Sequence, residues 1–531
     1  MMNSMAQYIA QGKAFLGMEF GSTRIKAVLI DQEHQVIASG SHTWENRLEN
    51  GIWTYHFDEV WAGMQACYLS LTNHVREQYQ TELTTLAGIG ISGMMHGYIA
   101  LDSENEPLAP FRTWRNTMTG EAAAALTKCF NFNVPQRWNV AHLYQSILNN
   151  EEHVSRIVTL TTLAGYVHLC LTGRKILGAG EASGVFPLDE LSNYDSRMLE
   201  AFDKLIEDKM MPWKLRELLP DVLTAGEQAG VLTAQGANLL DPTGRLQAGI
   251  SVCPPEGDAG TGMVATNSVA ERTGNISAGT SIFAMLVLEK QLSAIYPEID
   301  IVATPSGRPV AMVHCNNGLS ELDAWVKTFG EAAELMGAHV DRSVLYDKLY
   351  QKALEGESDG GDLLACNYLS GEHITGFDKG CPLFLRMPES RFNLANFMRV
   401  QLFSILATVA IGIRLLVEKE QVGFDVLNGH GGLFKTKNVG QRMLAAAVNT
   451  PVAVLRTAGE GGAWGIALLA AYMINRRENE TLEVYLASRV FSDNSAEIIM
   501  SNAIDVEGFD AYLKKYRNLL EVEKTATRAL E

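Results

Sequence analysis

The sequence predicts an α/β protein made of two similar halves. Its 531 residues exceed the usual size of one domain and predict at least two. Two strand–turn–strand patterns of one design occur at residues 14–31 and 273–288, and each opens about half of the chain. Short apolar strands then alternate with helical patterns, which is the element order of an α/β fold.

The first half begins with the hairpin at residues 14–31, in which two apolar runs flank a polar turn at Gly21. A third strand is expected from residue 34. A helix is predicted next, because apolar residues recur at helical spacing: Val60, Met64, Cys67 and Leu71. Residues 86–93 form a short apolar run ending in glycine, which is typical of a buried strand leading into a loop.

The second half opens with the matching hairpin at residues 273–288. A strand, a glycine turn and a helix are expected from residue 423, and a glycine-rich turn at residues 456–465 leads into a helix of small residues. The most apolar stretch, residues 402–417, contains Arg414 and is short for a bilayer span, so it predicts a buried helix. The segment after residue 477 carries no recognisable chemistry and is expected to pack at the periphery.

Composition and charge exclude several classes of protein. With 43 basic and 61 acidic residues, the net charge of −18 repels nucleic acid and anionic lipid, so neither nucleic acid nor membrane is expected as a partner. The seven cysteines are widely spaced, odd in number and without a CxxC pair, which disfavours a disulfide framework or zinc site and favours the cytoplasm. The N-terminal sequence lacks the layout of a signal peptide.

Two glycine turns are the first candidates for chemistry. In the first, Gly21, Ser22 and Thr23 can present backbone N–H groups and hydroxyls to phosphate oxygens, while Glu19 can orient a Mg²⁺ ion through water. Lys26 lies on the following strand. The second turn has the same pattern: Gly279, Thr280 and Ser281. One such turn alone is more often a plain hairpin turn. The pair favours a nucleotide triphosphate held from two sides.

Asp258 and His96 are the next candidates. Small neighbours leave the Asp258 carboxylate accessible at the start of a helix, where it can accept a proton from a substrate hydroxyl. The alternative is a helix cap. His96 follows a buried strand and can hydrogen-bond a sugar hydroxyl, with Met95 as an apolar wall. A lone histidine is more often a satisfied core residue.

Two further groups suit a polyol and a nucleotide. Trp114, Arg115 and Asn116 offer a stacking face and forked donors, although a surface cation–π pair has the same pattern. Close backbone approach to a ring or phosphate, or else plain turn structure, is expected at Gly431, Gly432, Phe434 and Lys435. The sequence has no GxxxxGK[ST] and no GxGxxG followed by an acidic residue, so an ATP site would not be a P-loop.

Taken in order, these motifs resemble the FGGY carbohydrate kinases, which share the actin-like, ribonuclease-H-like ATPase fold. The resemblance covers residues 15–472 and rests on the series GMEFGSTRIKAVLID, ISGMMHG, TWRNT, LTG with EASG, PPEGDAG, ISAGTS, GHGG and EGGAWGIALLAA. It implies two actin-like domains facing across a cleft, a sugar-binding one at residues 1–265 and an adenosine-binding one at residues 266–531.

The resemblance also implies roles for single residues. Asp258 matches the family's general base, and Met95 with His96 matches the sugar-contacting pair of xylulokinase-like members. Phosphate contacts are implied for Ser22, Thr23, Thr280 and Ser281, and adenosine contacts for Gly431 and Gly432. The chain departs from the family at Glu19, where Asp is usual, and at Asn116, where Asp is frequent.

The expected function is therefore ATP- and Mg²⁺-dependent phosphorylation of a ketopentose, D-xylulose or L-ribulose, by a cytoplasmic enzyme. Its partners would be the sugar and ATP, and a homodimer is left open. The alternative is a nucleotide-dependent binding or regulatory protein without sugar transfer. Glu19 and Asn116 favour this alternative, whereas the absence of a recognisable DNA-binding or client-binding segment counts against it.

Overall fold

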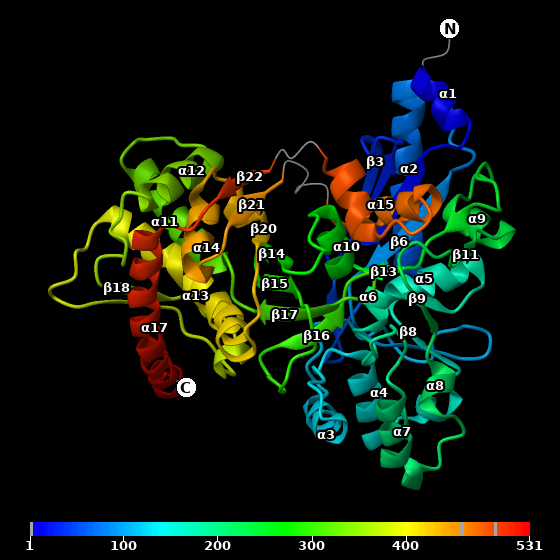
Figure 1. Ribbon diagram of the computed structural model, residues 1–531, viewed down its shortest axis with the longest axis horizontal. Helices are drawn as coiled ribbons and strands as arrows, with labels where there is room; N and C mark the ends of the chain where they lie inside the picture. The colour runs from blue at the N-terminus through cyan, green and yellow to red at the C-terminus, as the bar shows by residue number, and fades with distance from the viewer. Residues whose placement is uncertain (1–3, 456–460, 493–495, 531) are drawn as a thin grey trace. The chain divides into compact units, whose positions relative to one another are not determined.

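The computed structural model describes residues 4–455, 461–492 and 496–530 and divides them into two compact units (Figure 1). The first unit comprises residues 4–269, 301–310 and 461–492. The second comprises residues 270–300, 311–455 and 496–530. Residues 456–460, the first part of the predicted glycine-rich turn, lie outside the described residues.

The first unit is built on a mixed sheet with the strand order β11-β12-β6-β1-β2-β3, and β13 pairs with β6 beside this path. The strands are β1 Phe15–Phe20, β2 Arg24–Ile30, β3 Val36–Thr43, β6 Gly88–Gly93, β11 Gly230–Val231, β12 Ser251–Val252 and β13 Glu256–Gly257. Small two-stranded sheets are formed by β4 Arg47–Glu49, β5 Ile52–Thr54, β7 Ile99–Leu101, β8 Thr159–Thr161, β9 Ile176–Gly178 and β10 Asp221–Leu223.

The helices of the first unit include a long helix, α2, that packs on β2 and β3, and α15, which packs on β1 and β6. They are α1 Ser4–Ala10, α2 Phe57–Tyr79, α3 Gly120–Phe130, α4 Asn139–Leu148, α5 Leu163–Thr172, α6 Ala179–Ala182, α7 Ser196–Leu205, α8 Leu215–Leu218, α9 Ala234–Leu240, α10 Asp258–Ala265, α15 Gly461–Asn475 and α16 Leu482–Tyr485. The approach of α15 to β1 is so close that a Cβ on Gly17 would lie 2.1 Å from the Ala463 carbonyl oxygen. Glycine is therefore required at that strand position.

The second unit contains most of a sheet of the order β16-β17-β15-β14-β20-β21-β22; residues 301–310, which include most of β16 and the start of β17, are counted with the first unit. Its strands are β14 Thr273–Ala278, β15 Ile282–Val287, β16 Asp300–Ala303, β17 Pro309–Cys315, β20 Val426–Gly431, β21 Val452–Val454 and β22 Glu497–Ile499, and a separate hairpin pairs β18 Leu363–Cys366 with β19 Leu383–Arg386. Its helices are α11 Ser320–Leu335, α12 Arg342–Ala353, α13 Leu394–Glu420, α14 Val439–Val448 and α17 Ala503–Ala529.

The two sheets share one design, as the paired hairpins in the sequence predicted. In the first, β1 pairs antiparallel with β2 and parallel with β6. In the second, β14 pairs antiparallel with β15 and parallel with β20. The next strands agree too, because β12 and β21 continue the parallel part and then pair antiparallel with β11 and β22. Each unit therefore carries its own glycine turn between its two central antiparallel strands.

The most apolar helix, α13, lies inside the second unit, as the sequence predicted for residues 402–417. By length and composition it is the one described helix that could cross a membrane, and 78% of its most apolar window is buried in the protein. Such burial is typical of a core helix of a globular domain. All seven cysteines lie in the described residues, where they are free thiols.

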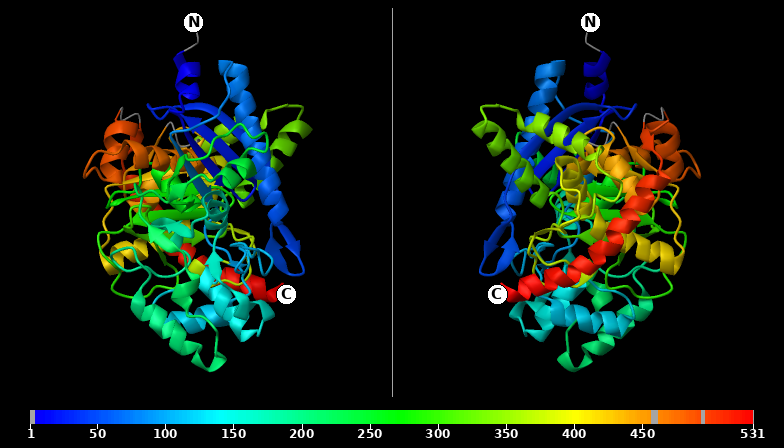
Figure 2. Two further views of the ribbon diagram at one scale, coloured as in Figure 1. Left: turned by 90° about the vertical axis from the view of Figure 1, so that its right-hand side faces the viewer. Right: turned by 90° about the vertical axis from the view of Figure 1, so that its left-hand side faces the viewer.

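The prediction for the segment after residue 477 is wrong in one respect. Helix α17 packs against α14, β18 and α13, and the right-hand view of Figure 2 shows it in red as one continuous helix that runs to the C-terminus. The side chains of Tyr512 and Tyr516 on α17 are fully buried, and the Tyr512 hydroxyl donates to the Ala365 carbonyl over 3.0 Å. This helix forms part of the core of its unit, because its apolar residues recur at the spacing of one helix face.

Candidate functional site

The candidate site of the first unit lies at the carboxyl ends of three neighbouring strands. Strands β1 and β13 both run parallel to β6, and the register places Glu19 and Glu256 on either side of Ser92. The chain leaves all three strands at the same edge, into the turn at Gly21, the Met95 segment and helix α10. In α/β sheets, ligands bind at this edge because the loops there converge.

Asp258 is the first residue of α10 and is half-buried. Its Oδ1 accepts a hydrogen bond from the backbone N–H of Met95 over 3.1 Å. Burial raises the pKa of this carboxyl, and the N–H groups of Met95 and Ala259 oppose the shift. A carboxylate whose pKa is raised is a better proton acceptor than one at its ordinary value.

Glu19, the residue expected to bind a metal ion, is on β1 and lies close to Asp258. One of its carboxylate oxygens, Oε2, accepts from the Ala463 N–H at the start of α15 over 3.2 Å. Burial and then the charge of Asp258 raise the pKa of Glu19 to about 7, while Lys26, opposite it on β2, opposes the shift. A Cβ on Gly462 would lie 2.4 Å from the other oxygen, so glycine is required for α15 to approach.

Two buried carboxyls that the sequence analysis did not assign lie behind Asp258. Glu256 Oε1 and Oε2 accept from the N–H groups of Gly180 and Glu181 over 3.2 and 2.9 Å. Burial still raises the pKa of Glu256 to about 8. Glu181 is fully buried, and burial, Glu256 and Asp258 raise its pKa well above the usual range against the effect of nearby Thr162. Glu181 belongs to the motif EASG and Glu256 to the motif PPEGDAG, both quoted above. Their spacing in the sequence did not indicate that the two residues lie next to each other.

Met95 and His96 occupy a strained turn after β6. His96 is buried and has a backbone φ of 70°, in the left-handed region that only a few per cent of non-glycine residues adopt. Its Nδ1 lies 3.3 Å from the Gly184 carbonyl oxygen, and its ring stacks on Trp138 with centroids 6.3 Å apart. Such strain persists where the surroundings impose it and is frequent at functional sites.

The segment with Trp114, Arg115 and Asn116 is tied to β5. The Arg115 guanidinium lies 3.8 Å from the centroid of the Trp53 ring, so the cation–π alternative applies to Arg115, with Trp53 as its partner. The Asn116 amide nitrogen donates to the carbonyls of Trp53 and Thr113 over 2.8 and 2.9 Å, and its oxygen accepts from the Trp53 N–H over 2.9 Å. Trp114 packs partly buried against the core.

The turn at residues 21–23 is held from one side through its carbonyls. The Gly21 carbonyl accepts from Trp44 Nε1 over 2.7 Å, and the Ser22 carbonyl accepts from the Tyr55 hydroxyl over 2.5 Å. The Thr23 carbonyl accepts from the Trp44 N–H over 3.3 Å. Carbonyls fixed in this way leave the turn's hydroxyls for a ligand, and the side chains of Ser22 and Thr23 are exposed.

The turn at residues 279–281 in the second unit is also held through its carbonyls, here by backbone N–H groups. The carbonyls of Gly279 and Thr280 accept from the N–H groups of Leu319 and Gly318 over 2.9 and 2.8 Å. Within the described part of the chain, the hydroxyls of both turns make no hydrogen bond to protein: Ser22, Thr23, Thr280 and Ser281.

The glycines expected to face adenosine lie beside the second turn. Gly431 is in register with Ala278, has a φ of 97°, and a Cβ on it would lie 2.4 Å from the Ala278 carbonyl oxygen. Gly432 begins a 3-10 turn, Gly432–Phe434. Phe434 is buried beneath this turn, whereas Lys435 is exposed. The structure thus brings Gly431 and Gly432 to the turn edge and turns Phe434 toward the core.

Among the residues that the structure describes, no three His, Cys, Asp or Glu side chains are grouped as a metal site. Mg²⁺ keeps several waters and takes one or two carboxylates together with substrate phosphates, and Glu19 offers one such carboxylate at this sheet edge. Burial and the charge of Asp258 raise the pKa of Glu19. A cation bound at Glu19 would offset the repulsion between these two carboxylates, so the site also suits a metal ion electrostatically.

The sequence matches the N-terminal domain of the FGGY family of carbohydrate kinases over residues 14–259 and its C-terminal domain over residues 274–474. The chain belongs to the FGGY family of carbohydrate kinases. The resemblance drawn from the motifs is confirmed, and so is the two-domain actin-like fold. The protein is a carbohydrate kinase, which sets aside the regulatory protein without sugar transfer.

Known FGGY proteins similar to this chain include a xylulose kinase of Haemophilus influenzae, 23% identical over 88% of this chain and 92% of that protein. Among solved structures, the xylulose kinase of Lactobacillus acidophilus has a TM-score of 0.78 at 15% identity, covering 98% of this chain and 100% of the other. The glycerol kinase of Plasmodium falciparum with ADP has a TM-score of 0.76 at 14% identity, covering 96% and 98%. Kinases of different sugars and polyols share this fold, so the fold does not select the substrate.

Proposed function

We propose that this FGGY kinase transfers the γ-phosphoryl group of ATP to a hydroxyl of a ketopentose, with Asp258 as general base. The contact between Asp258 and Met95 carries the proposal. It joins the proton acceptor to the Met95–His96 segment through one hydrogen bond of 3.1 Å. A hydroxyl bound at His96 would therefore lie within reach of the carboxylate that must take its proton.

The chain's own residues have distinct tasks in this reaction. Asp258 accepts the hydroxyl proton as the sugar oxygen attacks the γ-phosphorus and the bond to the leaving ADP oxygen breaks. The turn hydroxyls of Ser22, Thr23, Thr280 and Ser281 and the N–H groups beside them hold phosphate oxygens. Lys26 opposes the negative charge of Glu19 from β2.

ATP and Mg²⁺ are proposed as the cosubstrate and metal. When bound, Mg²⁺ neutralises charge on the transferred phosphoryl group. Glu19 is the residue proposed to hold it, through water, because its carboxylate is partly accessible and lies at the same sheet edge as the first turn. A carboxyl whose pKa is near 7 binds a cation better as pH rises, since the ion displaces the proton.

The sugar is proposed to be D-xylulose, with L-ribulose as the second candidate. Support comes from the Met95–His96 pair and from the curated relatives, which include xylulose kinases of Haemophilus influenzae and Staphylococcus xylosus. The difference between the two sugars is the configuration of a hydroxyl, which side-chain placement decides.

A coupled assay of ADP release tests the proposal on the full chain. D-xylulose, L-ribulose, other pentuloses, hexuloses, glycerol and gluconate are compared at fixed ATP and Mg²⁺. The proposal expects kcat/KM for D-xylulose to exceed that for every hexulose and polyol. A higher kcat/KM for glycerol or gluconate would overturn the ketopentose assignment.

A further inference from the structure

The phosphate turn of the second unit rests on a short segment that follows β17. This segment, residues 316–318, continues into α11. The N–H groups of Gly318 and Leu319 donate to the Thr280 and Gly279 carbonyls over 2.8 and 2.9 Å. A Cβ on Gly318 would lie 2.3 Å from the Gly279 oxygen, so the two backbones are in direct contact. A shift of the segment must therefore shift the turn.

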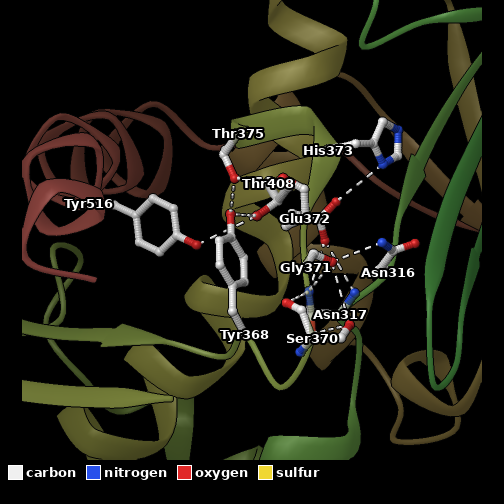
Figure 3. Close-up of polar contacts among 10 residues, drawn as sticks. All are labelled: Asn316, Asn317, Tyr368, Ser370, Gly371, Glu372, His373, Thr375, Thr408 and Tyr516. Atoms are coloured by element: carbon white, nitrogen blue, oxygen red, sulfur yellow. Dashed lines mark hydrogen bonds and ion pairs between the residues drawn. The ribbon is translucent and has the colours of Figure 1, made fainter. Parts of the chain in front are cut away.

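Asn317 anchors this segment to the loop after β18, as Figure 3 shows. Its side-chain oxygen accepts from the N–H groups of Leu369 and Ser370 over 2.9 and 3.0 Å. The neighbouring Asn316 amide donates to the Gly371 carbonyl over 2.8 Å, and the Asn367 amide donates to the Gly318 carbonyl over 3.0 Å. Residues 316–318 belong to neither a strand nor a helix, so they lack the regular backbone hydrogen bonds of such an element. The side chains of Asn316, Asn317 and Asn367 hold the segment in place instead.

Glu372 completes the anchor from within the core. Its side chain is fully buried, and its Oε2 accepts from both the backbone N–H and the side-chain nitrogen of Asn317, over 3.2 and 3.1 Å (Figure 3). The Glu372 N–H donates to the Phe377 carbonyl over 2.7 Å, which fixes the carboxyl's own backbone. A buried carboxylate that accepts two N–H groups holds its donors more firmly than neutral acceptors do.

From these contacts we infer that Glu372 is a positioning residue for the nucleotide: through Asn317 and Gly318 it fixes the turn at Thr280 that grips a phosphate. This inference rests on the proposed function, because it assigns the phosphate contact to that turn. It concerns ADP or ATP affinity alone, since none of these contacts involves the sugar side of the site.

The same geometry makes nucleotide affinity sensitive to pH. The groups that face Glu372 are His373, whose Nδ1 lies 3.8 Å from Oε1, and the buried thiol of Cys315, while the His314 ring stacks on His373. Burial raises the pKa of Glu372 to about 7, against the hydrogen bonds from Asn317. Protonation weakens Oε2 as an acceptor, so the turn is held less firmly below pH 7 than above it.

The experiment measures the dissociation constant of ADP by titration calorimetry on the full chain at pH 6 and pH 8. Glu372→Ala is expected to raise it about tenfold, as the loss of a charge-assisted anchor predicts. Glu372→Gln keeps an acceptor oxygen and is expected to stay within about threefold of wild type at pH 8. The ratio of the wild-type to the Glu372→Gln dissociation constant should change between pH 6 and pH 8. Titration of ADP itself affects both constants equally and therefore cancels in this ratio.

Glu523→Ala is the matched control. Glu523 is also a fully buried carboxyl of the second unit, and it accepts the Cys381 N–H over 2.6 Å. Its removal should lower the melting temperature as Glu372→Ala does, yet leave the ADP dissociation constant within about twofold of wild type. An unchanged constant in Glu372→Ala, or equal weakening in both alanine variants, would overturn the inference.

Thr280→Val separates this inference from the proposed function. If Thr280→Val weakens ADP binding and Glu372→Ala does not, only the positioning role is lost. If neither the wild type nor the variants distinguish ADP from AMP, the phosphate turn itself is refuted. Should Glu372→Ala fail to fold, the pH dependence of Glu372→Gln decides: a ratio that stays constant from pH 6 to pH 8 counts against the inference.

Discussion

The carboxylate of Asp258 and the backbone N–H of Met95 are joined by a hydrogen bond of 3.1 Å, although 163 positions separate them in the chain. The bond spans the carboxyl ends of β6 and β13, which pair in parallel. It holds the carboxylate directly against the Met95–His96 segment, where the proposed sugar hydroxyl would bind. The proposed proton acceptor and the proposed sugar segment are therefore in direct contact.

Asp258→Asn is expected to lower kcat by about 10³-fold, because the amide keeps the shape and can still accept from Met95 but cannot take a proton. The dissociation constant of ADP should remain within about twofold, as the turns are unchanged. Steady-state kinetics and calorimetry measure the two quantities. Turnover within about tenfold of wild type would remove Asp258 from the role of base.

His96 variants test the sugar contact while separating it from backbone strain. His96→Asn keeps a residue that tolerates the left-handed conformation, whereas His96→Ala adds strain of about 1 kcal/mol. Both variants are expected to raise the KM for the sugar about tenfold or more, while the KM for ATP stays within about twofold of wild type. If the two KM values rise together in His96→Asn, the histidine acts through the core packing with Trp138 instead.

The hairpins, the buried strand before Met95 and helix α13 were predictable, because apolar period and glycine turns are local signals. The meeting of Glu256 with Glu181 was not. It depends on β13 pairing with β6 and on the first turn of α6 donating its N–H groups to Glu256, and the residues next to Glu256 in the sequence do not indicate either contact.

The side chains that fix the turns were equally hidden in the sequence. Trp44 and Tyr55 read as ordinary apolar residues, yet their polar atoms hold the carbonyls of Gly21 and Ser22. Asn317 lies in an Asn-Asn-Gly run that reads as a plain turn. Its partner Glu372 lies 55 positions away, and only the tertiary fold brings the pair together.

Glu256→Gln should remove a pH dependence of stability. The pKa of Glu256 is raised to about 8 in the folded state by burial, whereas an unfolded glutamate has a pKa near 4.5. The folded state therefore binds more protons than the unfolded one between these values, so its free energy of unfolding falls as pH rises through that window.

Thermal unfolding of the two proteins from pH 5 to pH 9 measures this effect. The variant loses an acceptor and should be the less stable at pH 5. Its deficit should shrink by on the order of 2 kcal/mol toward pH 9, where the wild type carries a buried charge. A deficit that is constant across this range would contradict the assigned protonation of Glu256.

Asn116→Asp tests whether the amide serves the fold. Both donor hydrogens of Asn116 point at carbonyl oxygens, those of Trp53 at 2.8 Å and Thr113 at 2.9 Å. A carboxylate there would face two acceptors in a buried place, so the free energy of unfolding should fall by about 3 kcal/mol at pH 8. The loss should be smaller at pH 5, where a protonated carboxyl can donate once.

Asn479→Asp, an exposed substitution of equal charge, should change the melting temperature little. If Asn116→Asp instead leaves the melting temperature unchanged and alters the KM for the sugar, the side chain turns toward the substrate, as the sequence prediction has it.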